Sequence, residues 1–160
     1  MSTEILLDSN NTTSRKSRSA MVTIRLAQSA LINPFGARPI LSAEQAWAAL
    51  VRKARRPQDF VPVVSSCEII TETDTKIEAV VNFKPGVAHA TRIREVCTLQ
   101  APCRLDYAME DGSMSVNIVS MGPGRRTEDL VLTFYFSWEH PGVEEGSTEA
   151  KEIFENHLKV

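Results

Sequence analysis

The chain has 160 residues, a formal net charge of −2 and 42% hydrophobic residues, which suits one globular domain of ordinary composition. Because phosphate binding needs a basic face, this charge balance argues against a nucleic-acid partner. No stretch approaches the roughly 20 apolar residues of a membrane span, and the N-terminus lacks the apolar run of a signal peptide. We therefore expect a cytoplasmic protein with no membrane span.

The N-terminal segment, residues 1–20, is polar and rich in Ser, Thr and Asn. Such a segment buries too little apolar area to offset the entropy lost on ordering. We predict a disordered leader followed by a single domain over residues 21–160. The domain begins with a predicted strand, because Val22, Ile24 and Leu26 alternate with polar residues at the period of a half-buried strand.

The clearest predicted helix covers residues 42–55. Ser42 and Gln45 have the spacing of a capping box, and Pro57 follows the helix and ends it. We expect charged residues such as Lys53 to fall largely off the apolar stripe. The stripe has the i, i+3, i+4, i+7 spacing of an amphipathic helix and consists of Ala43, Ala46, Trp47, Leu50, Val51 and Ala54.

Beyond residue 65 the pattern changes to short strands separated by turn-forming residues, of which Asp111-Gly112 is the most characteristic of a tight hairpin. A final helix is predicted from the cap residue Ser147 to Val160. This order predicts an α+β protein with a curved antiparallel sheet of about seven strands around a helix and an apolar cavity between them. The strands after the first helix are predicted at 67–72, 76–83, 91–99, 103–109, 114–120 and 129–138.

Several segments are similar to the AtaL-like family of the SRPBCC (START-like) superfamily of helix-grip proteins. The matching segments are Asn33-Pro34, residues 41–47, residues 50–62, Arg94-Glu95-Val96, Gly112-Ser113, residues 117–120, residues 130–134 and residues 138–144. The resemblance implies the helix-grip fold and binding of a hydrophobic small molecule without a cofactor. Some fungal members lie in gene clusters for specialised metabolites. Relatives usually close the cavity with a longer final helix, so we expect a more open cavity here, or one capped in a homodimer.

Glu95 is the first candidate catalytic residue. It shares a predicted strand face with Ile93, Cys97 and Leu99, and a carboxyl on such an apolar face has a raised pKa, as a general acid or base requires. The alternatives are an ion pair with a neighbour such as Arg104, or a strand end near solvent.

Two further polar residues are candidates for binding a ligand carbonyl or stabilising enolate charge. The Asn117 amide would orient the carbonyl, or would instead satisfy a β-bulge. The Tyr107 hydroxyl would donate to the ligand, or would instead be satisfied within the core. The predicted ligand-binding wall consists of Trp47, Leu50, Ile93, Cys97, Leu105, Phe134, Phe136, Trp138 and Phe154, for which plain core packing is the alternative.

Neither the histidines, His89, His140 and His157, nor the cysteines, Cys67, Cys97 and Cys103, have the spacing of metal ligands. We therefore assign no metal, and expect reduced, apolar cysteines in strands. The preferred hypothesis is a cofactor-independent cyclase, lyase or isomerase that transfers protons on a hydrophobic, polyketide-like or aromatic metabolite. Two alternatives remain open: a non-catalytic carrier of a hydrophobic ligand, and a protein-interaction module.

Overall fold

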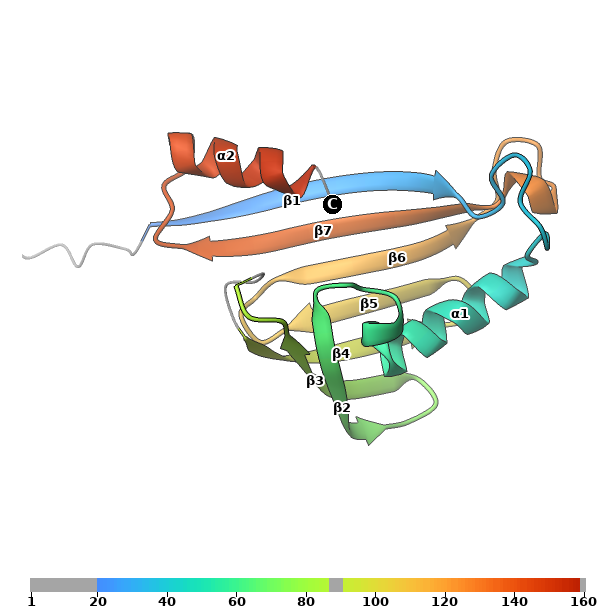
Figure 1. Ribbon diagram of the computed structural model, residues 1–160, viewed down its shortest axis with the longest axis horizontal. Helices are drawn as coiled ribbons and strands as arrows, with labels where there is room; N and C mark the ends of the chain where they lie inside the picture. The colour runs from blue at the N-terminus through green and yellow to red at the C-terminus, as the bar shows by residue number, and fades with distance from the viewer. Residues whose placement is uncertain (1–19, 87–90, 159–160) are drawn as a thin grey trace, which may run out of the picture.

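A computed structural model describes residues 20–86 and 91–158, so the predicted leader, apart from its last residue, and His89 lie outside the described residues. Seven strands form one antiparallel sheet in the order β1-β7-β6-β5-β4-β3-β2, which curves around α1 (Figure 1). This confirms the predicted fold class. The elements in chain order are β1 (Met21–Leu31), α1 (Ala43–Arg55), η1 (Pro57–Asp59), β2 (Val64–Glu72), β3 (Lys76–Phe83), β4 (Arg92–Gln100), β5 (Arg104–Met109), β6 (Met114–Ser120), η2 (Thr127–Asp129), β7 (Val131–Pro141) and α2 (Thr148–His157).

The helix α1 begins at the predicted capping box. The backbone N–H of Gln45 donates to the Ser42 hydroxyl at 3.2 Å, and the Ser42 N–H donates to the Gln45 side chain at 2.9 Å. One face of α1 then packs on the sheet and covers the side that we call the inner face. The buried cluster that joins them contains Ala46, Leu50, Ala54, Ile77, Cys97, Leu105, Tyr107, Val119 and Leu130.

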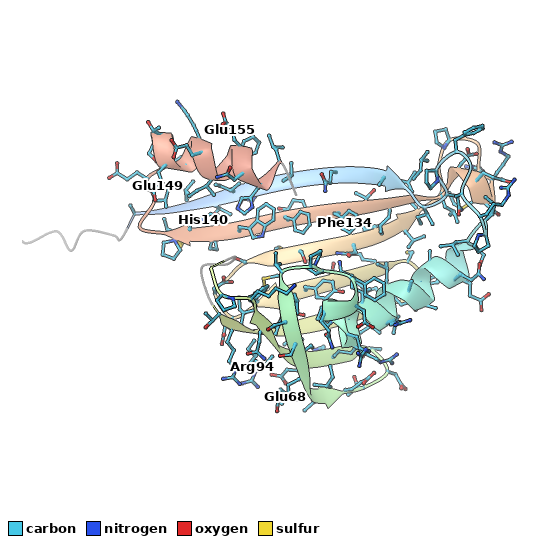
Figure 2. All side chains as sticks on the ribbon, viewed as in Figure 1. Glu68, Arg94, Phe134, His140, Glu149 and Glu155 are labelled. Atoms are coloured by element: carbon cyan, nitrogen blue, oxygen red, sulfur yellow. The ribbon has the colours of Figure 1, made fainter. Side chains whose placement is uncertain are left out.

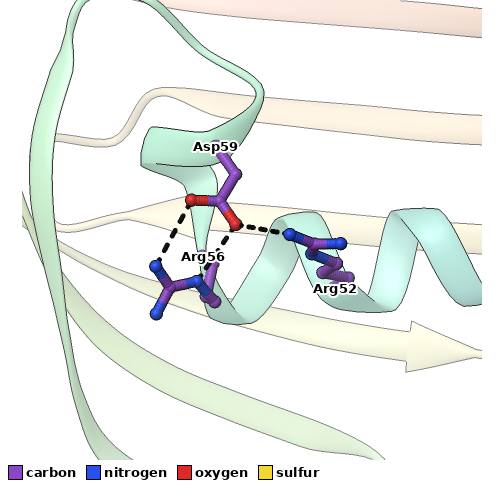
Figure 3. A network of polar contacts seen from close by, with 3 residues as sticks. All are labelled: Arg52, Arg56 and Asp59. Atoms are coloured by element: carbon purple, nitrogen blue, oxygen red, sulfur yellow. Dashed lines mark hydrogen bonds and ion pairs between the residues drawn. The ribbon is translucent and has the colours of Figure 1, made fainter.

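The C-terminal end of α1 is fixed by Asp59 of η1. The Asp59 carboxylate accepts hydrogen bonds from Arg52 at 2.9 Å and Arg56 at 3.0 Å (Figure 3). The hydrogen bonds from Arg56 and then from Arg52 lower the pKa of Asp59. Because these arginines flank Lys53 in the sequence, the network holds the helical turn that carries Lys53.

The strands follow the predicted pattern, with differences at their ends. β1 continues five residues past Leu26, because it pairs with β7 along its whole length, from Met21 opposite Pro141 to Leu31 opposite Val131. The turn η2 occupies the predicted start of the last strand. Cys103 lies just outside β5 and is exposed, so its expected place as a buried strand residue is wrong.

The helix α2 lies alongside β1 (Figure 1) and begins at the predicted cap, where the Ala150 N–H donates to the Ser147 hydroxyl at 3.1 Å. Its 10 residues span about 15 Å. Ala150 packs with Val22 and Ile24, but Phe154 is 40% exposed, so plain core packing, the alternative to its predicted place in the ligand-binding wall, is wrong for Phe154. No helix in the described part of the chain is long and apolar enough to cross a membrane.

Candidate functional site

Glu95 lies on the inner face in the middle of β4. It is opposite Ala79 of β3 and Met109 of β5, and its residue is 9% exposed. Ile93 and Cys97 on either side are also buried, which confirms the predicted strand parity. The alternative of a solvent-exposed strand end is therefore wrong.

Lys53 of α1 is the charged residue that affects the pKa of Glu95. Burial raises the pKa of Glu95 to about 7, and the positive charge of Lys53 acts against this increase. Burial likewise lowers the pKa of Lys53, against the effect of the Glu95 charge. Arg104 instead pairs with Asp106 at 2.8 Å, so the predicted alternative of a Glu95–Arg104 ion pair is wrong.

Lys53 reaches across from α1 to the sheet. Its ammonium nitrogen, Nζ, donates to the Asn117 side-chain oxygen, Oδ1, at 2.9 Å. The same nitrogen lies 5.4 Å from the Phe134 ring centroid and 5.9 Å from that of Tyr107, within the range of cation–π attraction. The end of the Lys53 side chain thus lies next to side chains from β5, β6 and β7.

Asn117 is 1% exposed on β6. Its pairing with Leu105 of β5 and Phe134 of β7 runs without a register shift, so the alternative that its amide satisfies a bulge is wrong. The Asn117 oxygen instead positions the end of Lys53.

The Tyr107 hydroxyl is buried and has no regular hydrogen-bond partner among the described residues. Its cross-strand neighbour Cys97 offers only a thiol, which is a weak partner. Within the core, the Tyr107 hydroxyl is therefore satisfied only by the weak interaction with the Cys97 thiol. Burial raises the pKa of Tyr107, so the hydroxyl keeps its proton and remains a donor. Burial raises the pKa of Cys97 to about 12, so its thiol is neutral and a poor nucleophile.

Beside Lys53, β7 carries what we call the aromatic row: Phe134, Phe136 and Trp138, continued by His157 of α2. Successive ring centroids are 6.2, 4.7 and 3.8 Å apart, and the rings are parallel within 9°. Figure 2 shows the direction of this row along β7, from Phe134 towards the end that carries His140. The three β7 residues are only half-buried, so the edges of these stacked rings are accessible next to Lys53.

The remaining predicted ligand-binding residues fall into three places. Leu50, Cys97 and Leu105 belong to the packed core under α1, and Trp47 lies against it. Ile93 packs in a separate cluster with Val64 and Val81. Phe154 lies apart from Glu95, in a hollow of about 370 Å³ between β1 and α2. A second hollow, of about 400 Å³ around Val80 and Arg94, is on the opposite face of the sheet from Glu95.

Lys53 is the site residue that the sequence analysis missed. Its spacing from Ala46 and Leu50, seven and three residues, places it on the buried side of α1, and a charged residue on such a stripe is a signal for function. Across the described residues, no group of three or more His, Cys, Asp or Glu side chains is arranged to hold a metal ion.

The fold and the polar cluster of Glu95, Lys53, Asn117 and Tyr107 define a helix-grip protein with ionisable groups on its inner face. Residues 26–160 match the family model of acetylaranotin biosynthesis cluster protein L, and the chain belongs to that family. Acetylaranotin biosynthesis cluster protein L of Aspergillus terreus is 27% identical over 140 residues, which cover 86% of this chain and 80% of that protein.

Solved structures share the fold at low identity. The Zhui aromatase/cyclase from Streptomyces sp. R1128 has a TM-score of 0.60 at 14% identity, over 87% of this chain and 85% of that one. The di-domain aromatase/cyclase StfQ has a TM-score of 0.61 at 12% identity over 86% of this chain, which spans only 46% of that protein. Norcoclaurine synthase from Thalictrum flavum, solved with dopamine and hydroxybenzaldehyde, has a TM-score of 0.51 at 16% identity over 98% and 87% of the two chains.

Proposed function

We propose that this protein is a cofactor-independent cyclase or dehydratase of specialised metabolism, acting on an apolar, carbonyl-rich metabolite of polyketide-like or aromatic type. One observation carries the proposal: the buried Glu95 carboxyl is electrostatically coupled to the half-buried Lys53, which is hydrogen-bonded to Asn117, and burial raises the pKa of Glu95 to about 7. The family membership and the aromatase/cyclase folds support a biosynthetic role. A carrier of hydrophobic molecules has no need of such a pair.

The chemistry begins with Glu95. Its carboxylate removes a proton from the carbon between two carbonyl groups, and its pKa near neutrality suits that transfer. The electron pair moves onto a carbonyl oxygen, where the positive charge of Lys53 and the Tyr107 hydroxyl, held in the core only by the weak Cys97 thiol, stabilise the enolate. The enolate carbon then attacks a second carbonyl of the same molecule, and the protonated Glu95 gives its proton to the alkoxide that forms. Glu95 then removes the second proton of the former enolate carbon and passes it to the departing hydroxyl, which leaves as water.

The aromatic row orients the substrate. A flat ring of the substrate can lie against the accessible edges of these side chains, in the edge-to-face arrangement that aromatic pairs favour, and Phe134 lies both in the row and next to Lys53. A conjugated substrate lying along β7 therefore brings one end to Lys53 and Glu95. Holding the chain in this way supplies the proximity that ring closure requires.

Native mass spectrometry of protein purified from its source tests the proposal. We expect a bound apolar compound with ketone groups. When this compound is incubated with fresh protein, it should give a product that has lost water or gained a ring, detected by liquid chromatography and mass spectrometry. Recovery of the compound unchanged would show that the protein is a carrier and would contradict the proposal.

A further inference from the structure

We propose that Lys53 is a carbonyl-capturing nucleophile, whose side-chain amine forms an imine with a ketone or aldehyde group of the apolar substrate. This inference rests on the proposed function and identifies the bond that holds the substrate during proton transfer. Lys53 then has a covalent as well as an electrostatic role in the candidate site.

The surroundings of Lys53 differ from those of the other paired cations. Among the described residues its one hydrogen-bond partner is the neutral amide of Asn117, and no carboxylate lies within ion-pair distance of it. The ring centroids of Phe134 and Tyr107 lie 5.4 and 5.9 Å from its nitrogen. By contrast, a carboxylate pairs directly with each of Arg52, Arg55, Arg56, Arg94, Arg104 and Arg126.

Burial makes the neutral amine of Lys53 easier to reach than that of an exposed lysine. A lysine without a directly bound carboxylate, in an apolar environment, loses its proton more readily and becomes a nucleophile. Burial lowers the pKa of Lys53 accordingly. Asn117 accepts one N–H and so fixes the nitrogen, while the half-buried state of Lys53 and Phe134 leaves an approach for the substrate.

The covalent step balances with the groups present. The lysine amine adds to the carbonyl carbon and gives a carbinolamine, whose hydroxyl leaves as water with the proton of Glu95. The product is a protonated imine, because the nitrogen keeps one of its own protons. The Glu95 carboxylate then removes a proton from the adjacent carbon, and the electron pair moves towards the iminium nitrogen. The resulting enamine is the carbon nucleophile, and hydrolysis returns the amine.

Reductive trapping tests this inference on the wild-type protein. The protein is treated near neutral pH with 2-naphthaldehyde and sodium cyanoborohydride, which reduces an imine to a stable secondary amine. Peptide mapping then measures the modification of each lysine. We expect Lys53 to be modified about tenfold faster than exposed lysines. The internal controls are Lys76, Lys84 and Lys151, all exposed.

Glu95→Gln should slow the modification of Lys53 about tenfold or more, because the acid that expels water is lost, and should leave Lys84 unaffected. Equal modification of Lys53 and the exposed lysines, or none at Lys53, would overturn the inference. Each variant is first checked by circular dichroism and by its melting temperature.

A second measurement separates this inference from the proposed function. Lys53→Arg keeps the positive charge but cannot form an imine. If Lys53→Arg turns over the native ligand at the wild-type rate while Glu95→Gln does not, the covalent role is wrong and the proton-transfer function stands. If Lys53 is trapped selectively but wild-type protein returns its ligand unchanged, the proposed function fails and the amine is still reactive.

Discussion

The Glu95→Gln variant is expected to be more stable than the wild-type protein at about pH 8, by about 3 kcal/mol in the free energy of unfolding, and nearly equal to it at about pH 5. This stability difference follows from the pKa of Glu95, which rises from 4.5 in the unfolded chain to about 7 in the folded protein. Each pKa unit corresponds to about 1.4 kcal/mol. Glutamine has the shape of the protonated carboxyl and no charge to desolvate.

The sign follows from proton binding. Between pH 4.5 and about 7, the folded protein holds the Glu95 proton and the unfolded chain has released it, so stability falls as pH rises through this range. Above the pKa of Glu95 in the folded protein, the free-energy cost of the buried carboxylate is constant. Glu95→Gln has no such cost, so the difference in the free energy of unfolding between the two proteins grows from acid to alkaline pH.

Urea unfolding of both proteins at a series of pH values measures this difference. Glu78→Gln is the matched control: Glu78 lies on the neighbouring strand β3, pairs with Arg94 at the surface, and should change stability by about 1 kcal/mol or less. A Glu95→Gln effect that does not vary with pH would contradict a buried carboxyl that titrates near neutrality.

The same substitution is expected to lower turnover of the native ligand by about 10²- to 10⁴-fold, the usual contribution of a positioned acid or base. The amide of glutamine neither accepts nor releases a proton at neutral pH. Ligand binding should change little, because the aromatic row and Lys53 remain. The variant is thus expected to be more stable and less active, a trade-off typical of active-site residues.

Initial rates at saturating ligand and a separate binding titration distinguish the two effects. Glu78→Gln should retain the wild-type rate. An unchanged rate in folded Glu95→Gln would mean that Glu95 transfers no proton in the reaction.

The fold could be predicted from the sequence to a large extent, because its signals are local. The capping box at Ser42 and Gln45, the alternation in β3 and β6, and the cap at Ser147 each depend on neighbouring residues. The end of β1 could not be predicted in this way. Residues 27–31 show no clear alternation, and their strand conformation comes from pairing with β7, which is distant in the sequence.

The sequence predicted the site residues that lie on the sheet, but not Lys53, which lies on α1. Parity alone placed Glu95 on the inner face with Cys97. The partner of Glu95 was missed, because Lys53 is one of several cations near the end of α1, and only the tertiary structure shows which of them turns inward. Arg52 and Arg56 point to Asp59 instead, a pairing that depends on the turn η1. The aromatic row on β7 also depends on tertiary structure, since His157 of α2 stacks on Trp138 at the end of the row.

The titration of the Glu95 carboxyl carbon, followed by nuclear magnetic resonance in isotopically labelled protein, tests the central claim most directly. We expect a midpoint at about pH 7, and a higher midpoint in Lys53→Met, because the opposing positive charge is removed. A midpoint near the ordinary value of 4.5, unchanged by Lys53→Met, would show that Glu95 is solvated and uncoupled from Lys53, and would contradict the account.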